Sequence, residues 1–369
     1  MWDQMRQRIL EAANKSSRYF SQVLSSKRPR LMYVGGWLGY NNLGDEALFE
    51  AYKKLFNGYS LLHYPHVGRR VLSIPTKLFR IAEAAVLAGG TLINKGSCPD
   101  SVQECLDIFP KFYVFGTGVA NPAFWARIQG WTDNLMQWKT VLQRCAYVGV
   151  RGPLSAELLI NIGIDNVEVI GDPAVVFASD NFDNSDSYMP NSIGLNVGWD
   201  NVAQWGEPQK IYTEYVRLAT IARKAGWKIR WFVVWPPDLT ITKELAKASN
   251  TQVELYEIYS NPYNYIDLVK SLSTFVGTRL HSVVLATCAY VPSVMLEYRP
   301  KCKDYMMSIG QETNTIRTDK FKAEDVWDIV KTWNIERTKV SQELYRSIKV
   351  LRNKQRVKAN ELMREMISS

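Results

Sequence analysis

Short apolar runs that alternate with helical stretches are the feature that most constrains how this chain of 369 residues can fold. The runs LMYVGG, AAVLAGG, FYVFGTG and CAYVGV are each as long as a strand, and amphipathic stretches such as LGDEALFEAYKKLF lie between them. Apolar strands joined by helices are typical of a parallel sheet that is covered on both faces. The sequence therefore predicts a doubly wound α/β domain that begins at Leu31.

A polar segment, ASDNFDNSDSYMPNS, interrupts this pattern at residues 178–192, and the pattern then restarts with SIGLNVG, KIRWFVVW, STFVGT and PSVMLEY. We predict an N-terminal Rossmann-like domain at residues 31–180, a linker at 181–191 and a C-terminal Rossmann-like domain at 192–335. Two doubly wound domains of this kind are expected to face each other across a cleft. Their functional loops belong at the carboxyl ends of the strands.

Positive charge is concentrated at the two ends of the chain. The formal net charge is +9, of which residues 1–30 carry +5 and residues 337–369 carry +6, so the remainder is close to −2. We predict a basic N-terminal helical arm at residues 1–30 and a basic C-terminal helix at residues 336–369. Because the body is nearly neutral, no nucleic-acid partner is expected.

The C-terminal segment has helical periodicity, because apolar side chains recur at Val340, Leu344, Ile348 and Leu351. We expect this face to pack on the body and a cationic face to remain in solvent. Basic ends of this kind suit either peripheral contact with anionic lipid head groups or solvated helix faces that aid solubility.

Cysteine and histidine usage indicates neither disulfides nor a metal site. The five cysteines are scattered without CxxC spacing, and there are only three histidines. No apolar run is long enough to span a bilayer, and the N-terminus lacks a cleavable hydrophobic stretch. We therefore expect reduced thiols, no bound metal, and a cytoplasmic location, either free or peripheral at the inner face of the plasma membrane.

Glycine-rich strand exits in the first half carry candidate ligand-binding positions. The first strand enters GGWLGYNNLGDEA, and later strands enter AGGTLINKG and FGTGVANP. Glycines there let a ligand approach the backbone closely, although tight turns require them as well. In CAYVGVRGPLSAELL, Arg151 leaves a strand just before a helix, where a phosphate or carboxylate would meet both a guanidinium and a helix N-terminus. The candidates are Asn42, Asp45, Gly89, Gly90, Gly116, Gly118 and Arg151.

The strongest local signal lies in STFVGTRLHSVVLATCAY, where polar residues stand at the start of an otherwise apolar helix. Thr278 is expected to cap that helix, and Arg279 and His281 fall in its first turn. The following strand exits into PSVMLEYRPKCKDYM, which places Glu297 and Lys301 near the same edge of the sheet. Taken singly, each of these residues is more often structural, but their convergence at successive strand exits favours a ligand site.

Together, GYNNLGDEA, LAGGTLIN, VRGPLSAELL with VIGDPAV, and FVGTRLHSVVLATCAYVPSVMLEYRPKCKDYM resemble the polysaccharide pyruvyl transferase family over roughly residues 31–310. The resemblance implies a fold similar to the two-domain (GT-B) glycosyltransferases, phosphoenolpyruvate as donor, and no metal or cofactor. It implies catalytic roles for Arg151, His281 and Lys301, with Arg279 beside them. The chain departs from the family in two segments, which read AGG instead of a triple glycine and VRGP instead of VRDP.

The function implied by this resemblance is transfer of a pyruvyl group from phosphoenolpyruvate to two hydroxyls of a sugar, with release of phosphate. The sugar belongs to a cell-surface polysaccharide or its precursor, whether lipid-linked or free. We expect Arg151, Arg279 and Lys301 to hold the two anionic ends of the donor and His281 to be the general acid. Thr278, Asn42, Asp45, Glu297 and the four glycines complete the expected substrate contacts.

Two alternatives remain at this point. A nucleotide-sugar glycosyltransferase of the GT-B type would have the same architecture. A non-catalytic, membrane-associated binding protein would account for the basic ends, but it leaves Arg151, Arg279, His281 and Lys301 unexplained.

Overall fold

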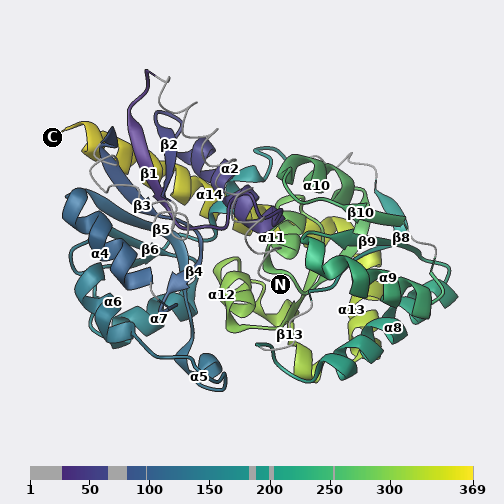
Figure 1. Ribbon diagram of the computed structural model, residues 1–369. Coiled ribbons are helices and arrows are strands. Elements are labelled where there is room, and N and C mark those ends of the chain that lie inside the picture. Colours follow the sequence, from purple (N-terminus) through teal and green to yellow (C-terminus); the bar gives the residue numbers. More distant parts are fainter. Residues whose placement is uncertain are drawn as a thin grey trace. The chain divides into compact units, whose positions relative to one another are not determined.

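The computed structural model describes residues 27–64, 81–96, 98–182, 188–198, 203–251 and 254–368. It contains two parallel sheets in two compact units (Figure 1). Unit 1 combines residues 27–40 with Leu48–Val176 and the end of the chain from Asn353, and unit 2 combines Asn41–Ala47 with Phe177–Arg352. The prediction of two successive parallel α/β sheets is confirmed. Most of the predicted N-terminal arm and part of the predicted linker lie outside the described residues.

The sheet of unit 1 has the strand order β2-β1-β3-β5-β6-β7, and β4 pairs with β5 beyond the end of β3. All of its pairings are parallel, as the apolar runs of the sequence predicted. The strands are β1 (Arg30–Val34), β2 (Ser60–Tyr64), β3 (Ala84–Leu87), β4 (Gly90–Ile93), β5 (Phe112–Val119), β6 (Tyr147–Val150) and β7 (Val167–Val169).

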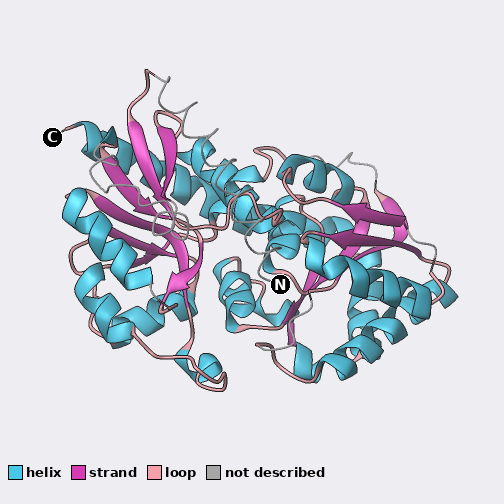
Figure 2. Cartoon of the chain, in the orientation of Figure 1, coloured by secondary structure: helices cyan, strands magenta, loops and turns pink. Residues whose placement is uncertain are grey.

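Helices cover both faces of this sheet because successive strand residues point to opposite sides (Figure 2). Met32 and Val34 of β1 join a core with buried side chains of α4 (Cys98–Ile108), α6 (Leu135–Leu142) and α7 (Pro153–Asn161). Tyr33 points the other way and meets Phe49 and Tyr52 of α2 (Leu43–Leu55) edge-on, with ring centroids 5.1 and 5.2 Å away. A short helix, α5 (Pro122–Trp125), follows β5.

The sheet of unit 2 has the order β10-β9-β8-β11-β12-β13 and is also parallel throughout. The chain builds outward from β8 in one direction, then returns to place β11 on the other side of β8. Ligands of open α/β sheets bind at such reversal points, at the carboxyl ends of the strands. The strands are β8 (Met189–Asn196), β9 (Lys228–Val233), β10 (Glu254–Glu257), β11 (Leu272–Gly277), β12 (Ser293–Glu297) and β13 (Thr315–Arg317).

One face of this second sheet packs against α8 (Pro208–Lys224), α9 (Leu239–Ala248) and α13 (Ala323–Ile335), whose buried side chains share a core with Leu195, Trp231 and Leu296. On the other face, Phe232 and Phe275 meet Tyr265 of α10 (Pro262–Val269). The helices α11 (Leu280–Cys288) and α12 (Pro300–Ser308) follow β11 and β12 directly. Their first turns therefore start at the carboxyl edge of the sheet.

The C-terminal helix α14 (Arg337–Ile367) has the predicted buried stripe, because Val340, Leu344, Ile348 and Leu351 are all at most 7% exposed. The expectation that its basic residues form a solvent face is wrong for Arg337 and Arg352, which are themselves buried. Arg337 donates to the Tyr290 carbonyl, and Arg352 donates to the carbonyls of Ala178 and Ser179. These cations donate to buried backbone carbonyls, two of which also accept from a second side chain, Ser341 at Tyr290 and Tyr290 at Ser179.

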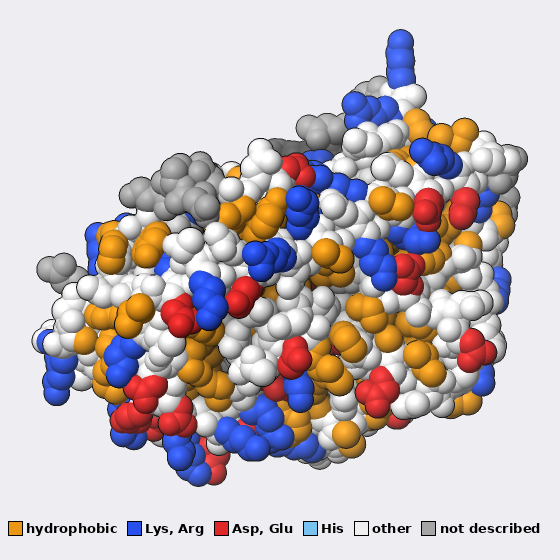
Figure 3. Space-filling view, turned by 180° about the vertical axis from the view of Figure 1, so that it is seen from behind, with side chains coloured by type: hydrophobic (Ala, Val, Ile, Leu, Met, Phe, Trp, Pro, Cys, Tyr) orange, Lys and Arg blue, Asp and Glu red, His pale blue; other side chains and the backbone are white. Residues whose placement is uncertain are grey.

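Further along α14, Lys354 and Lys358 both form ion pairs with Glu168. On the face of the molecule seen in Figure 3, basic and acidic side chains are interspersed. Within the described ranges, every helix is either too short or too polar to traverse a lipid bilayer.

Candidate functional site

The carboxyl ends of β8 and β11 lie side by side where the strand order of the second sheet reverses, and Asn196 connects them. Asn196 is fully buried, and its side-chain amide donates to the Phe232 carbonyl at 2.9 Å. Its oxygen accepts from the backbone N–H of Arg279 at 3.0 Å and from the Ser282 hydroxyl at 2.8 Å. These bonds fix the turn from β11 into α11, which carries the predicted site residues.

Arg279 is the N-cap residue of α11, and its guanidinium forms a bidentate pair with Asp238, which is fully buried. Nε and Nη2 lie 2.8 and 2.6 Å from the two carboxylate oxygens. Burial alone would lower the pKa of Arg279, but the hydrogen bonds and charge of Asp238 raise it above its usual range. The predicted anion ligand Arg279 is therefore held, and largely neutralised, by a carboxylate of its own unit.

Two neighbours define the path of the Arg279 side chain. The Trp235 ring centroid lies 4.8 Å from Cζ, within the range of a cation–π contact. On another side lies Gly198, where an added Cβ would come within 2.6 Å of Nε. A glycine is therefore needed two residues past β8.

Thr278 does not cap α11, so that expectation is wrong. Arg279 occupies the N-cap position, and its backbone N–H donates to the side-chain oxygen of Asn196. The buried Thr278 hydroxyl hydrogen-bonds with the Tyr215 hydroxyl. A substrate contact for Thr278 stays a prediction.

His281 lies in the first turn of α11, and the first turn of α2 packs against its imidazole. A Cβ at Gly44 would lie 2.3 Å from Nδ1 and 2.9 Å from Cγ of His281, so only glycine fits there. Asn42 caps α2 by accepting from the Gly44 N–H at 3.0 Å, and Leu43 donates to the Val234 carbonyl at 3.0 Å. The structure thus brings Gly44, with its cap Asn42, to His281, while a substrate contact for Asp45 stays a prediction.

Lys301 lies in the first turn of α12, beside the buried ring of Tyr298. Its Nζ is 5.1 Å from the ring centroid, and the Cζ atoms of Arg299 and Arg279 are 5.1 and 5.8 Å from the same point. Across the part of the chain that the structure describes, no carboxylate forms an ion pair with Lys301. The first turns of α11 and α12 therefore share a group of three cations around one aromatic ring.

Glu297 ends β12 and is only 5% exposed. Burial raises the pKa of its carboxyl to about 7, against the opposing effect of Lys303. A carboxyl that titrates near neutrality at a strand exit is suited to proton transfer or to hydrogen bonding in either protonation state. Its role as a substrate ligand stays a prediction.

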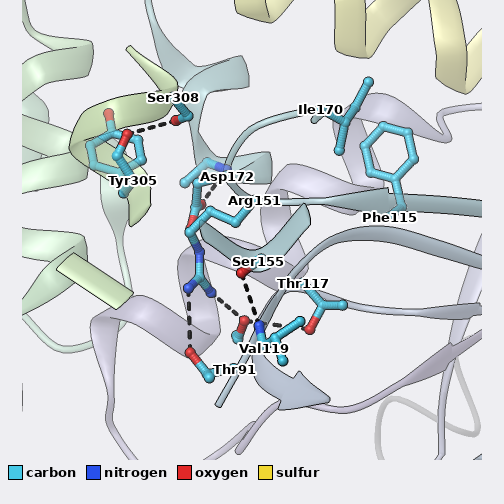
Figure 4. Close-up of polar contacts among 12 residues, drawn as sticks. Thr91, Phe115, Thr117, Val119, Arg151, Ser155, Ile170, Asp172, Tyr305 and Ser308 are labelled. Atoms are coloured by element: carbon cyan, nitrogen blue, oxygen red, sulfur yellow. Dashed lines mark hydrogen bonds and ion pairs between the residues drawn. The ribbon is translucent and has the colours of Figure 1, made fainter. Parts of the chain in front are cut away.

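Arg151 of unit 1 is completely buried, and its side chain donates to three groups (Figure 4). Nε donates to Asp172 at 3.1 Å, Nη1 donates to the Thr91 hydroxyl at 3.3 Å, and Nη2 donates to the Gly90 carbonyl. VRGP and VIGDPAV, two of the segments that carry the family resemblance, therefore meet through the Arg151–Asp172 ion pair. Direct contact between Arg151 and a ligand stays a prediction.

The four candidate glycines of unit 1 have distinct surroundings. A Cβ at Gly118 would lie 2.6 Å from Nη1 of Arg151, while the carbonyl of Gly90 is one of the acceptors of Arg151. Gly89 packs on Leu48 of α2, and Gly116 has a φ of +70° with Pro173 against it. Gly90 and Gly118 thus lie against the Arg151 side chain. Gly89 leaves room for Leu48, and Gly116 lies at the register shift between β5 and β6.

Sequence reasoning missed four buried residues on which these arrangements depend, namely Asn196, Asp238, Asp172 and Tyr298. Asn196 and Tyr298 lie at strand exits, in NVG and EYRP, so their positions carried a usable signal. Asp238 follows a Trp-Pro-Pro loop, and nothing in its local sequence indicates that it pairs with Arg279. Across the described ranges, no three His, Cys, Asp or Glu side chains are grouped as metal ligands would be.

A family model described as polysaccharide pyruvyl transferase matches residues 42–300, which includes the first turn of α2 and the whole sequence through β12. No curated protein sequence matches the chain significantly.

Among solved structures, the chain resembles a UDP-glucosyltransferase from Polygonum tinctorium (TM-score 0.54, 12% identity, covering 94% of this chain and 100% of that one). It also resembles a putative UDP-N-acetylglucosamine 2-epimerase from Listeria monocytogenes (0.56, 10%, covering 88% and 94%). A third neighbour is a glycosyltransferase from Rickettsia africae (0.56, 11%, covering 93% and 100%). At these identities the likeness shows the fold, which is GT-B-like as predicted.

Proposed function

This chain belongs to the polysaccharide pyruvyl transferase family and is a transferase, and we propose that it moves the pyruvyl group of phosphoenolpyruvate onto two hydroxyls of one sugar. The products would be a cyclic pyruvate ketal and inorganic phosphate. The observation that carries the proposal is that Arg279 and His281 both stand at the start of α11, within the residues matched by the family, and that Arg279 and Lys301 of α12 both reach the ring of Tyr298.

The donor is a small enol with a phosphate and a carboxylate, and the second unit offers cationic groups suited to such anions. Lys301 has no carboxylate partner among the described residues, and α11 and α12 both begin at this edge of the sheet. An anion at this edge would meet both the ammonium group and the helix N-termini. Arg279 would contribute charge while it remains fixed by Asp238.

His281 is proposed as the general acid that protonates the methylene carbon of the donor. The central carbon then gains cationic character, and a sugar hydroxyl adds to it and loses its proton to solvent. A second hydroxyl of the same sugar displaces phosphate and closes the ketal, and its proton leaves with the phosphate. Asn42, Asp45, Thr278 and Glu297 are proposed as the substrate contacts around this centre.

The role proposed for Arg151 is catalytic by family resemblance, and its contacts favour an indirect action. The guanidinium holds the Gly90 carbonyl and the Thr91 hydroxyl while paired with Asp172. Arg151 would thus position the Gly90–Thr91 segment rather than donate a proton. Arg151→Lys retains the charge but loses the planar donor set, so it should reduce turnover.

The proposal is tested by phosphate release from phosphoenolpyruvate with a panel of glycosides as acceptors. Lys301→Ala should raise the KM for the donor about tenfold or more, whereas Lys243→Ala, an exposed lysine of α9, should leave it unchanged. Phosphoenolpyruvate should also raise the melting temperature, and UDP-glucose should not. Protection by UDP-glucose alone would instead support a nucleotide-sugar glycosyltransferase.

The acceptor is proposed to be a polysaccharide precursor, and a lipid-linked form would suit contact with anionic membranes. The N-terminal arm is the stronger candidate for that contact, because several basic residues of α14 serve intramolecular bonds. Flotation with anionic vesicles should show salt-sensitive binding that is lost when residues 1–26 are deleted. Equal flotation of the two proteins would exclude the arm as the lipid-binding element.

A further inference from the structure

Trp37 is an exposed aromatic residue in the loop that follows β1, and the proposed chemistry does not use it. It is 56% exposed, whereas every other tryptophan that the structure describes is buried or half-buried. The half-buried Tyr40 lies beside it, with the two ring centroids 5.8 Å apart. A single apolar residue in solvent is ordinary, but a pair of neighbouring aromatic rings marks a candidate binding surface.

The loop after β1 holds Trp37 outward because the residues on both sides of it are anchored. Leu38 is only 7% exposed, and the Gly35 carbonyl hydrogen-bonds with Nε2 of His63 at 3.1 Å. Gly35 has a φ of +122°, and a Cβ there would come within 2.5 Å of Cδ1 of Leu92 in β4. The exposure of the indole therefore follows from the close packing of its neighbours.

The exit of β4 contributes Lys95 to the same surface. Its Nζ lies 5.8 Å from the centroid of the Trp37 ring, within the range of a cation–π contact. The preceding residue, Asn94, is fully buried, donates to the Ala120 carbonyl at 3.1 Å and accepts from the Asn134 N–H at 2.8 Å. Lys95 is thus presented from a fixed backbone, and side chains from two strand exits meet at Trp37.

These two exits lie where the strand order of the first sheet reverses. The chain places β2 on one side of β1 and β3 on the other, and β4 follows β3 directly. Ligands of open α/β sheets bind at such reversal points. In unit 2 the reversal point carries the proposed donor site, so the reversal point of unit 1 is a place for a different ligand. From this loop the chain continues into Asn41–Ala47, whose Gly44 packs against His281.

We propose that Trp37 and Tyr40 form a platform on which a pyranose ring of the acceptor stacks, while Lys95 helps to hold the indole in place. The apolar C–H face of a sugar ring suits an aromatic face, and Trp and Tyr offer rigid, amphipathic contact area at low entropic cost. The small, highly charged donor would gain little from neutral rings. The inference rests on the proposed function, to which it adds the residues that bind the acceptor.

Saturation-transfer NMR with the methyl glycosides of galactose, glucose and mannose tests the platform without donor or turnover. In wild type, the C–H protons on one ring face of at least one glycoside should receive the strongest saturation. Trp37→Ala should weaken this binding about tenfold, and Trp37→Phe should retain most of it because a ring remains. Met136→Ala is the matched control, at an exposed apolar position of α6 in the same unit, and should bind like wild type.

With an accepted glycoside, Trp37→Ala should also raise the KM for the acceptor and leave the KM for phosphoenolpyruvate unchanged. An unchanged acceptor KM would overturn the platform and leave the proposed function standing. Glycoside binding that depends on Trp37, in a protein that releases no phosphate from phosphoenolpyruvate, would sink the proposed function and leave the platform intact.

Undiminished glycoside binding by Trp37→Ala would overturn the proposal, and so would a wild type that binds none of the three glycosides. Flotation with lipid vesicles that requires Trp37, without glycoside binding, would also overturn it and would assign the aromatic pair to membrane contact.

Discussion

Three glycines each lie against the side chain of a predicted site residue, in the pairs Gly44 with His281, Gly198 with Arg279, and Gly118 with Arg151. In each pair an added methyl group would come within 2.6 Å of the partner side chain. The missing side chain thus makes room for a functional one. These three glycines are informative because of the side chain that each of them accommodates, which sequence spacing alone does not reveal.

Gly44→Ala tests this at His281. The methyl group would displace the imidazole, and small misplacements of a catalytic group are costly, so kcat should fall roughly 10- to 100-fold. The KM for phosphoenolpyruvate should change little, because Lys301 is untouched. Gly58→Ala is the matched control, since a Cβ there meets only Met363 at an ordinary 3.6 Å. Equal activity of the two variants would show that the imidazole position is unimportant.

Glu297 should make stability depend on pH. Its pKa is raised to about 7 in the folded protein by burial, so the folded state binds this proton more tightly than the unfolded state. Stability from this group is therefore greatest below about pH 4.5 and declines as pH rises through 7. Urea unfolding should show Glu297→Gln gaining about 2 kcal/mol relative to wild type between pH 5 and 8. Glu244→Gln, at an exposed position, should show no such gain. If the stability of Glu297→Gln relative to wild type does not change with pH, the raised pKa of Glu297 is contradicted.

At the scale of elements, the sequence predicts helices and strands well where periodicity is strong. The apolar stripe of α14 was predicted correctly at four positions, and the strand before Arg279 and His281 was recognised. The start of α11 was assigned to the wrong capping residue, because its cap is supplied by Asn196, 83 residues away in the sequence. Local patterns do not encode such distant hydrogen bonds.

The buried cations of α14 give a test at this scale. Arg352→Ala removes a fully buried guanidinium and leaves the carbonyls of Ala178 and Ser179 without that donor. We expect a loss of roughly 2–4 kcal/mol in the free energy of unfolding. Arg346→Ala, on the exposed side of the same helix, should change it by less than about 0.5 kcal/mol. Similar losses in the two variants would show that the basic residues of α14 stabilise the fold through their charge alone and that the buried hydrogen bonds of Arg352 contribute nothing.

For the molecule as a whole, the two-sheet architecture was predictable because parallel sheets leave a repeated apolar signature in sequence. The candidate residues Arg151, Arg279 and Lys301 lie near strand exits, as the sequence indicated, while the ion-pair partners Asp172 and Asp238 were not predicted. Ion pairs of this kind join strand exits distant in sequence, so they become visible only when the sheet order is known. The overall charge of +9 was similarly uninformative about the site, where Arg279, Arg299 and Lys301 surround one aromatic ring and Arg279 is paired with Asp238.

The central claim is that His281, placed by α11 beside this cationic edge, donates a proton to the methylene carbon of phosphoenolpyruvate. The most direct test is turnover in deuterated water with an accepted glycoside, followed by mass spectrometry of the ketal and a phosphate assay. Wild type should place one solvent deuterium in the ketal methyl group for each phosphate released, and a folded His281→Ala should release none above background while still binding the donor. Normal turnover and labelling by His281→Ala would contradict the account.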